Sequence, residues 1–139
     1  MNFRNKLLVV LGDSIANGSG NHDFGVGEYL QQDLGFSLKK YCVGGARVGF
    51  VEGKSWLVEQ VKTLILDVAK GIIKSPDYII FNGFTNDCYI PEDGSRSTPD
   101  VPLGEIADTF AGFDLYSLNK SHTFSYCFET VLYTLLTKF

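Results

Sequence analysis

The sequence predicts an α/β protein with a doubly wound parallel sheet. The first observation behind this prediction is the apolar run 7–11, which ends at a glycine, as a strand buried on both faces does. The second is that segments with helical periodicity alternate with further short apolar runs. The third is the length of 139 residues, which suits one ordinary domain, whereas two domains would each be too small for a good core. We therefore expect a single domain over residues 1–139.

Six regular elements are expected along the chain. Short apolar runs bounded by glycine or proline indicate strands, and longer segments with apolar residues every three or four positions indicate helices. Gly35 is expected to cap the end of the first helix, and Ser121 or Thr123 the start of the last one. The predicted elements are strand 7–11, helix 24–34, strand 37–43, helix 55–73, strand 77–82 and helix 124–136.

A long irregular segment separates the third strand from the last helix. Residues 88–120 hold three of the four prolines together with several Gly, Ser and Asp residues, which are too many breakers for one regular element. Loops of this length inside a compact domain tend to be lids or binding loops. Within the segment, a short helix is expected at 103–110.

Composition excludes several classes of partner. The net charge of −4 leaves no electrostatic footprint for binding nucleic acid or an anionic membrane. The apolar run 7–11 is shorter than the core of a secretory signal, and no stretch approaches the roughly 20 apolar residues of a membrane helix. Cys42, Cys88 and Cys127 show no C-x-x-C spacing and are expected to be buried, reduced thiols. The sequence thus predicts a cytoplasmic protein without metal ion or cofactor.

Glycines and polar residues follow each of the three predicted strands. Because ligands bind at the carboxyl ends of parallel strands, we expect these residues to share one edge of the sheet. A serine hydroxyl, a turn that can expose an N–H group and a carboxamide are the parts of a serine hydrolase site, with a nucleophile and two kinds of oxyanion donor. The residues are, in strand order, Gly12-Asp13-Ser14, Gly44-Gly45 and Asn86-Asp87.

These three blocks resemble those of the SGNH, or GDSL, hydrolase family, and the resemblance covers the whole chain. The GDS motif stands at 12–14, the second-block glycine is Gly45, and the third-block Asn-Asp pair stands at 86–87. The resemblance implies that Ser14 is the nucleophile, and that the Ser14 N–H, the Gly45 N–H and the Asn86 side chain form the oxyanion hole. It also implies that small acyl or acetyl esters, including esters on carbohydrate, are the substrates.

Each of these residues also has a structural interpretation. Ser14 can cap a helix, and Gly45 can serve only as a tight turn. Asp13 is expected to be a turn former whose carboxylate accepts backbone N–H bonds, and Asn86-Asp87 can form an Asx turn. The residues assigned supporting rather than catalytic roles are Gly12, Asp13 and Asp87.

The chain departs from the family pattern at two points. Phe84 stands where the family has glycine, two residues before the third-block asparagine, and its side chain is expected to narrow the acyl pocket. The family takes its general base from a D-x-x-H motif near the C-terminus, and this chain contains no such motif. Its two histidines are His22, in the loop after the first block, and His122, which is interpreted as a helix-terminus or loop residue.

The number of strands accounts for the missing motif. A flavodoxin-like sheet in the order 2-1-3-4-5 needs on the order of 175 residues, whereas this sequence supplies three strands. We therefore expect the N-terminal part of an SGNH domain, truncated at its C-terminus. In the order 2-1-3 the third strand is an apolar edge, which is a template for another strand. A homo-oligomer or a complementing C-terminal polypeptide is expected to cover it.

Two further functions stay open beside the esterase. One is a non-catalytic binding or interaction module that keeps the pocket without a base. The other is a flavodoxin-like nucleotide or flavin binder, because residues 18–21 could cradle a phosphate at a helix N-terminus. Neither a P-loop lysine nor a G-x-G-x-x-G motif after the first strand supports that binder. Without a general base, the chain alone is expected to hydrolyse aryl esters very poorly.

Overall fold

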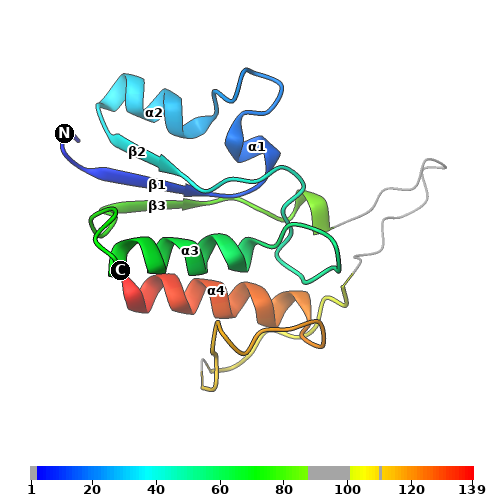
Figure 1. Cartoon of the computed structure of the whole chain (residues 1–139). Helices are drawn as coiled ribbons and strands as arrows, with labels where there is room; N and C mark the ends of the chain where they lie inside the picture. Colours follow the sequence, from blue (N-terminus) through cyan, green and yellow to red (C-terminus); the bar gives the residue numbers. More distant parts are fainter. Residues whose placement is uncertain (1–2, 88–100, 110) are drawn as a thin grey trace.

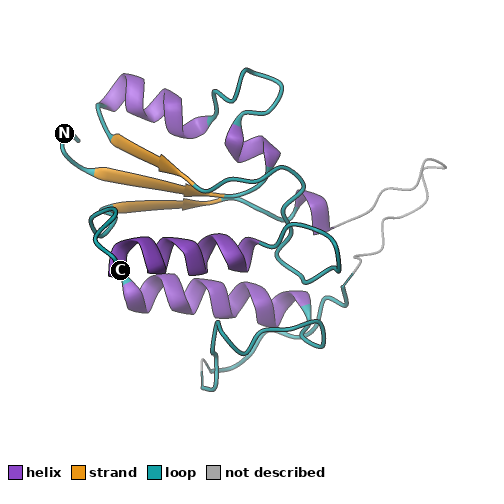
Figure 2. Cartoon of the chain, viewed as in Figure 1, coloured by secondary structure: helices purple, strands orange, loops and turns teal. Residues whose placement is uncertain are grey.

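The computed structural model describes residues 3–87, 101–109 and 111–139. Its sheet lies between two helical layers, with α1 and α2 on one face and α3 and α4 on the other (Figures 1 and 2). The elements are β1 (Leu7–Leu11), α1 (Ser14–Asn17), α2 (Val26–Leu34), β2 (Ser37–Lys40), α3 (Leu57–Ala69), β3 (Tyr78–Phe81), the 3-10 helix η1 (Thr85–Asp87) and α4 (Phe124–Lys138).

The sheet is parallel throughout and has the strand order β2-β1-β3. In its register, Leu8 of the central strand lies opposite Leu38 of β2 and Tyr78 of β3. The connection from β1 to β2 moves one way across the sheet and the connection from β2 to β3 moves back. Because crossovers between parallel strands are right-handed, their helices lie on opposite faces. The predicted α/β class and the strand order are confirmed.

Side chains of β1 alternate between two hydrophobic cores. Leu7, Val9 and Leu11 pack toward α3 and α4, and Leu8 and Val10 pack toward α2. All five residues are buried, as the continuous apolar run predicts. Full burial stabilises by about 1.5–3 kcal/mol for each such side chain. The central strand therefore anchors both layers and fixes where its carboxyl end emerges.

The last helix, α4, begins at the cap that the sequence suggests. Thr123 is its N-cap, and the Thr123 hydroxyl accepts a hydrogen bond from Tyr126 N at 3.3 Å. Cys127, Val131 and Leu135 are buried in the core shared with α3. Within the described ranges, no helix is both long and apolar enough to cross a membrane.

The prediction of a short helix at 103–110 is wrong for the part of this range that the structure describes. Residues 102–107 form no regular element, and residue 110 and residues 88–100 lie outside the described ranges. The carbonyls of Pro102 and Leu103 accept hydrogen bonds from the N–H groups of Phe124 and Ser125, at 2.9 and 2.8 Å. This segment therefore satisfies the free N–H groups at the start of α4 instead of bonding within a helix of its own.

Candidate active site

The turn after β1 is held by a buried glutamine from α3. Gln60 Nε2 donates to the Gly12 carbonyl and Gln60 Oε1 accepts from the Gly12 N–H, each at 2.8 Å. A Cβ atom on Gly12 would lie 2.6 Å from Ala16 Cβ and 2.7 Å from the Asn82 carbonyl oxygen. Position 12 therefore accepts only glycine without a local shift. Both observations place the first block rigidly at the carboxyl end of β1.

Asp13 caps the short helix that Ser14 begins. The fully buried Asp13 carboxylate accepts hydrogen bonds from Ile15 N at 2.9 Å and from Ala16 N at 3.5 Å. This is the structural role that the sequence indicates for Asp13. Ser14 is half-buried at the first position of α1, and no described group hydrogen-bonds to its hydroxyl.

The second block lies against the first. Val43 N donates to the Gly12 carbonyl at 3.0 Å, and a Cβ atom on Gly44 would lie 4.0 Å from Ser14 Cβ. Gly45 has φ +73°, in the left-handed region that favours glycine, and the space around its Cβ position is open. The predicted tight turn is therefore present at Gly45, beside the nucleophile candidate.

The third block joins the other two through Asn86. Its side-chain Nδ2 donates to Asp13 Oδ2 at 3.3 Å and to the Ala46 carbonyl at 3.1 Å. Asn86 therefore lies between the residue before Ser14 and the residue after Gly45. The structure brings the three predicted blocks together, while the catalytic roles of Ser14, Gly45 and Asn86 stay predictions.

Asp87 organises the loop that follows the second block. Its buried carboxylate accepts hydrogen bonds from Val48 N at 3.0 Å and from Gly49 N at 2.8 Å. Burial raises the pKa of Asp87 above its usual value, although these N–H groups and the charge of Arg47 act in the opposite direction. Asp87 therefore holds the backbone at residues 48 and 49, and its supporting role in the site stays a prediction.

Phe84, which stands where the family pattern has glycine, adopts a left-handed backbone conformation. Its φ is +82°, a left-handed value that costs a residue with a bulky side chain free energy. The Phe84 ring packs against Phe124 and Phe128 of α4, with ring centroids at 5.7 and 5.2 Å. These contacts turn the ring toward α4, and its effect on an acyl pocket stays a prediction.

Neither histidine contacts Ser14 in the described structure. His22 lies exposed in the loop between α1 and α2, with φ +54°. His122 stacks on Tyr126 at 4.7 Å, and its Nδ1 accepts a hydrogen bond from Asn119 N at 3.1 Å. The interpretation of His122 as a residue near a helix terminus is confirmed, because α4 begins two residues later.

The described cysteines and the clusters of possible metal ligands were the other candidates for a functional site. Cys42 is half-buried and Cys127 is buried, and burial raises the pKa of each thiol to about 11. Both are therefore protonated at neutral pH and poor nucleophiles. Cys88 lies outside the described ranges. In the described part of the chain, no group of three or more His, Cys, Asp or Glu residues is placed to hold a metal ion.

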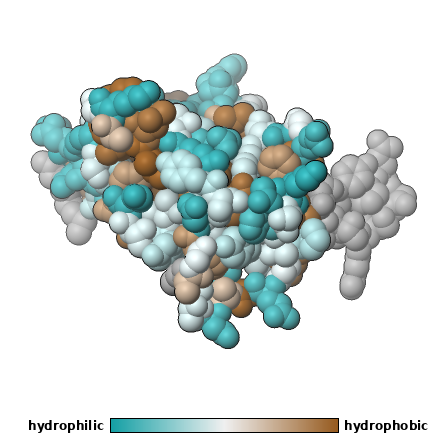
Figure 3. Space-filling view, turned by 60° about the horizontal axis from the view of Figure 1, so that its bottom comes forward, coloured by the Kyte–Doolittle hydropathy of each residue, from teal (hydrophilic) through white to brown (hydrophobic). Residues whose placement is uncertain are grey.

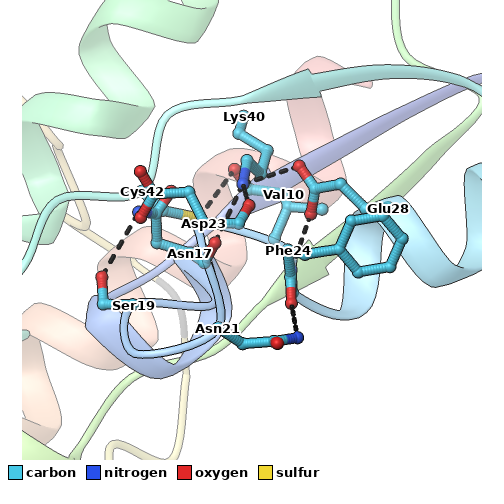
Figure 4. A network of polar contacts seen from close by, with 10 residues as sticks. Val10, Asn17, Ser19, Asn21, Asp23, Phe24, Glu28, Lys40 and Cys42 are labelled. Carbon is cyan, nitrogen blue, oxygen red and sulfur yellow. Dashed lines mark hydrogen bonds and ion pairs between the residues drawn. The ribbon is translucent and has the colours of Figure 1, made fainter.

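A polar network fixes the loop after α1 to β2 (Figure 4). Lys40 Nζ donates to the carbonyls of Asn17 and Asp23, at 2.9 and 2.7 Å, and pairs with Glu28 at 2.6 Å. Glu28 in turn accepts a hydrogen bond from Gly25 N at 2.9 Å. The Lys40 ammonium group thus binds both ends of the loop. Because Asn17 is the last residue of α1, the same contact also fixes the C-terminal end of this helix.

Sequence reasoning missed two of the residues that position the site. Gln60 is a polar residue inside the apolar stripe of α3, and a polar side chain at a core position is a signal that it binds something buried. Lys40 is the last residue of β2, next to the sheet edge where ligands are expected. Each acts on residues far along the chain, and sequence periodicity does not identify such partners.

Comparisons with known proteins agree with this geometry. The protein family described as "GDSL-like Lipase/Acylhydrolase" matches residues 8–134, which include all three blocks. One solved crystal structure superposes with a TM-score of 0.58 and 21% sequence identity over 95% of this chain, a likeness that supports the fold alone. The chain spans 51% of the length of that solved chain. No curated protein matches the sequence.

Proposed function

The chain belongs to the GDSL-like lipase/acylhydrolase family, and from this premise we propose that its site is built to hydrolyse small acyl or acetyl esters at Ser14. The observation that carries the proposal is the position of Asn86. Its amide bonds to Asp13 and to the Ala46 carbonyl, which are the neighbours of Ser14 and of Gly45. This position supports the proposal, because a nucleophile and its oxyanion donors must lie together at one edge of the sheet.

In the proposed reaction, Ser14 Oγ loses its proton and attacks the ester carbonyl carbon, and the alcohol leaves from the tetrahedral intermediate with a proton. Water then attacks the acyl-serine, which releases the carboxylic acid and restores the Ser14 hydroxyl. The Ser14 N–H, the Gly45 N–H and the Asn86 amide donate to the oxyanion. Each donor of this kind contributes about 10²–10³ in rate. Both Asn86 N–H groups have acceptors in the structure, so one must leave its acceptor when the oxyanion forms.

Among the described residues, none is assigned to remove the serine proton. Neither His22 nor His122 contacts Ser14, and positioned proton transfer is worth about 10²–10⁴ in rate. The 139-residue chain alone should therefore turn over esters slowly, even if the three proposed donors bind the oxyanion. The same observation favours the second candidate function, a binding module that keeps the pocket without catalysing a reaction.

A chemical-rescue experiment tests the proposal against the binding module. Hydrolysis of an aryl acetate is measured with and without imidazole, a diffusible base. The proposal expects imidazole to raise the protein-dependent rate, after subtraction of its own reaction with the ester. The Ser14→Ala variant should abolish this gain, and Asn86→Ala should lower it by about 10²–10³.

The matched control is Ser19→Ala, an exposed serine five residues further along. It should keep the imidazole-dependent rate. A gain that survives in Ser14→Ala would contradict Ser14 as the nucleophile. No gain in the folded wild-type chain would favour the binding module.

A further inference from the structure

A pocket of about 580 Å³ lies between the loop after β2 and the first turns of α3. We name it the β2–α3 pocket. Three half-buried aromatic side chains form its walls: Tyr41, Phe50 and Trp56. Exposed polar residues form its rim: Lys54, Ser55, Glu59 and Thr63. Aromatic walls below a polar rim suit a ligand that has apolar faces and polar edges.

The aromatic rings of the pocket are held by contacts within the chain. Trp56 Nε1 donates to the Val48 carbonyl at 2.7 Å. The Tyr41 hydroxyl donates to Asp67 Oδ2, also at 2.7 Å. The Phe50 ring packs edge-on against Trp56, with ring centroids 5.1 Å apart. Because the rings are already fixed, a ligand that stacks on them loses little affinity to side-chain ordering.

Positive charge already lies over two of the three rings. Lys39 Nζ is 5.1 Å from the centre of the Tyr41 ring. Lys62 Nζ is 5.5 Å from the centre of the Trp56 ring, and it also pairs with Glu59 Oε1 at 2.9 Å. A quaternary ammonium group, which aromatic cages often bind, would therefore meet like charge in this pocket. The charges favour a neutral ligand.

A wholly apolar group finds better surfaces elsewhere on the molecule. Figure 3 shows hydrophobic surface gathered at the end of the molecule where α4 ends. A second hollow, beside the N-terminal half of α4, is lined mainly by apolar side chains such as Leu103, Ile106 and Phe128. In the β2–α3 pocket, by contrast, an apolar ligand would leave the hydroxyl and carboxylate groups of the rim unused.

The pocket adjoins the turn that carries Ser14. Val43 lines the pocket, and its N–H donates to the Gly12 carbonyl at 3.0 Å. Gln60 lines the pocket as well, and its amide binds the N–H and the carbonyl of the same glycine. The loop that begins at Val43 lies at the carboxyl ends of the strands, between β2 and α3 (Figure 1). A bound ligand should therefore also affect the surroundings of Gly12.

We infer that the β2–α3 pocket binds a pyranose sugar, whose ring stacks on the aromatic walls while its hydroxyl groups bind the rim. A β-glucopyranoside has C–H groups on both faces of its ring and hydroxyl groups around its edge, which matches the two kinds of surface in the pocket. Glu59 accepts sugar hydroxyl groups at the carboxylate oxygen that does not pair with Lys62. The Thr63 hydroxyl donates to the Glu59 carbonyl at 2.7 Å, so its oxygen serves as a second acceptor.

The test uses the fluorescence of Trp56, which is the only tryptophan in the sequence. The 139-residue chain is titrated with methyl β-D-glucopyranoside. We expect a saturable change in emission with a Kd of about 1–10 mM, the range of a ligand with few contacts. Cyclohexanemethanol, a ring without the ring hydroxyls, and benzyltrimethylammonium, a cation, should each bind at least about tenfold more weakly. In amide NMR spectra, the sugar should shift the signals of Val43 and Gly12.

Two variants with matched controls locate the sugar. Phe50→Leu removes one aromatic wall, and Glu59→Gln removes the charged acceptor at an exposed position where folding should not suffer. Each should raise the Kd by about fivefold or more. Tyr29→Leu is the control for the ring, because Tyr29 forms a similar edge-on pair with Phe24 on the opposite layer. Glu105→Gln, also exposed, is the control for the carboxylate, and both controls should keep the wild-type Kd.

Three results would overturn the inference. The first is the absence of a saturable emission change up to about 100 mM sugar. The second is a Kd for the cyclohexane or the ammonium compound that equals or falls below that of the sugar, which would assign the pocket to an apolar or a cationic ligand. The third is a Kd that Phe50→Leu and Glu59→Gln leave unchanged. The glucoside contains no ester, so failure of the proposed hydrolysis leaves this test intact.

Discussion

The carboxyl-end edge of the sheet and its β3 flank are built on different principles. At the edge, buried polar side chains hold the loops from several sides: Gln60 binds Gly12, Asp13 caps α1, and Asp87 binds the N–H groups of residues 48 and 49. On the β3 flank, the described residues leave one side of a strand unpaired next to exposed apolar groups such as Leu136. The polar contacts of the edge are thus made within the chain, and we call it the closed edge. The flank has a strand side without a pairing partner among the described residues, and we call it the open flank.

This difference teaches where the site gets its geometry. The loops that carry Ser14, Gly45 and Asn86 are positioned by residues of this chain and need nothing from the open flank. Neither histidine contacts Ser14 within the described residues, and the described sheet leaves β3 unpaired on one side. Changes at the closed edge should therefore cost stability, whereas changes at exposed positions on the flank should leave stability nearly unchanged.

The largest effect should come from adding one methyl group at the closed edge. Gly12→Ala would place a Cβ atom 2.6 Å from Ala16 Cβ and 2.7 Å from the Asn82 carbonyl oxygen. We expect a loss of about 3 kcal/mol or more in the free energy of unfolding, measured in urea. Gly44→Ala is the matched control, because its nearest contact is an ordinary 4.0 Å, and it should change stability by less than about 0.5 kcal/mol. Equal losses in both variants would show that the first turn is not closed.

Removing the clamp on the same turn should have the next largest effect. Gln60→Leu replaces the amide with an apolar side chain of similar size and leaves the buried Gly12 N–H without its partner. An unsatisfied buried group of this kind costs about 1–3 kcal/mol. Gln32→Leu, at an exposed position on α2, should stay within about 0.5 kcal/mol of the wild type. If chemical denaturation finds the two variants equally stable, the clamp does not hold the edge.

Phe84 allows a sharper comparison, because it lies between the two regions. Phe84→Gly and Phe84→Ala remove the same ring contacts with α4, but only glycine relieves the φ of +82°. We expect the glycine variant to be the more stable of the two by about 1–2 kcal/mol, which is the cost of the left-handed conformation for alanine. Thermal or urea unfolding of the pair gives this difference directly. An alanine variant of equal or greater stability would contradict a strained backbone at this position.

The smallest expected effect is a pH dependence from Asp87. Because burial raises its pKa, the folded protein holds this proton more tightly than the unfolded chain. Its contribution to the free energy of unfolding is therefore present at low pH and is lost as pH rises above about 4, the usual value for aspartate. In Asp87→Asn this loss should be absent, so the stability difference between wild type and variant should shrink or reverse with rising pH. A variant at the exposed Asp114 serves as the control and should follow the wild-type profile.

Local sequence signals predicted the parts of the fold that depend on local pattern. The run at 7–11 forms β1 with its predicted bounds, whereas the left-handed backbone at Phe84 was not predicted. The Gln60 clamp joins residues 48 positions apart, so no local pattern contains it. The helix expected at 103–110 failed because the carbonyls of 102 and 103 bond to α4 instead. Hydrogen bonds between backbone groups that are far apart in the sequence cannot be predicted from sequence periodicity.

The measurement that tests the closed edge against the open flank most directly is residue-resolved hydrogen exchange of the unliganded chain. The amides of Gly12, Val48 and Gly49 donate to buried side chains and should be among the slowest, together with those of β1. The β3 amides that do not bond to β1 should exchange at least about 100-fold faster. If all β3 amides are as slow as those of β1, or if Gly12, Val48 and Gly49 exchange as fast as an exposed loop, the account is contradicted.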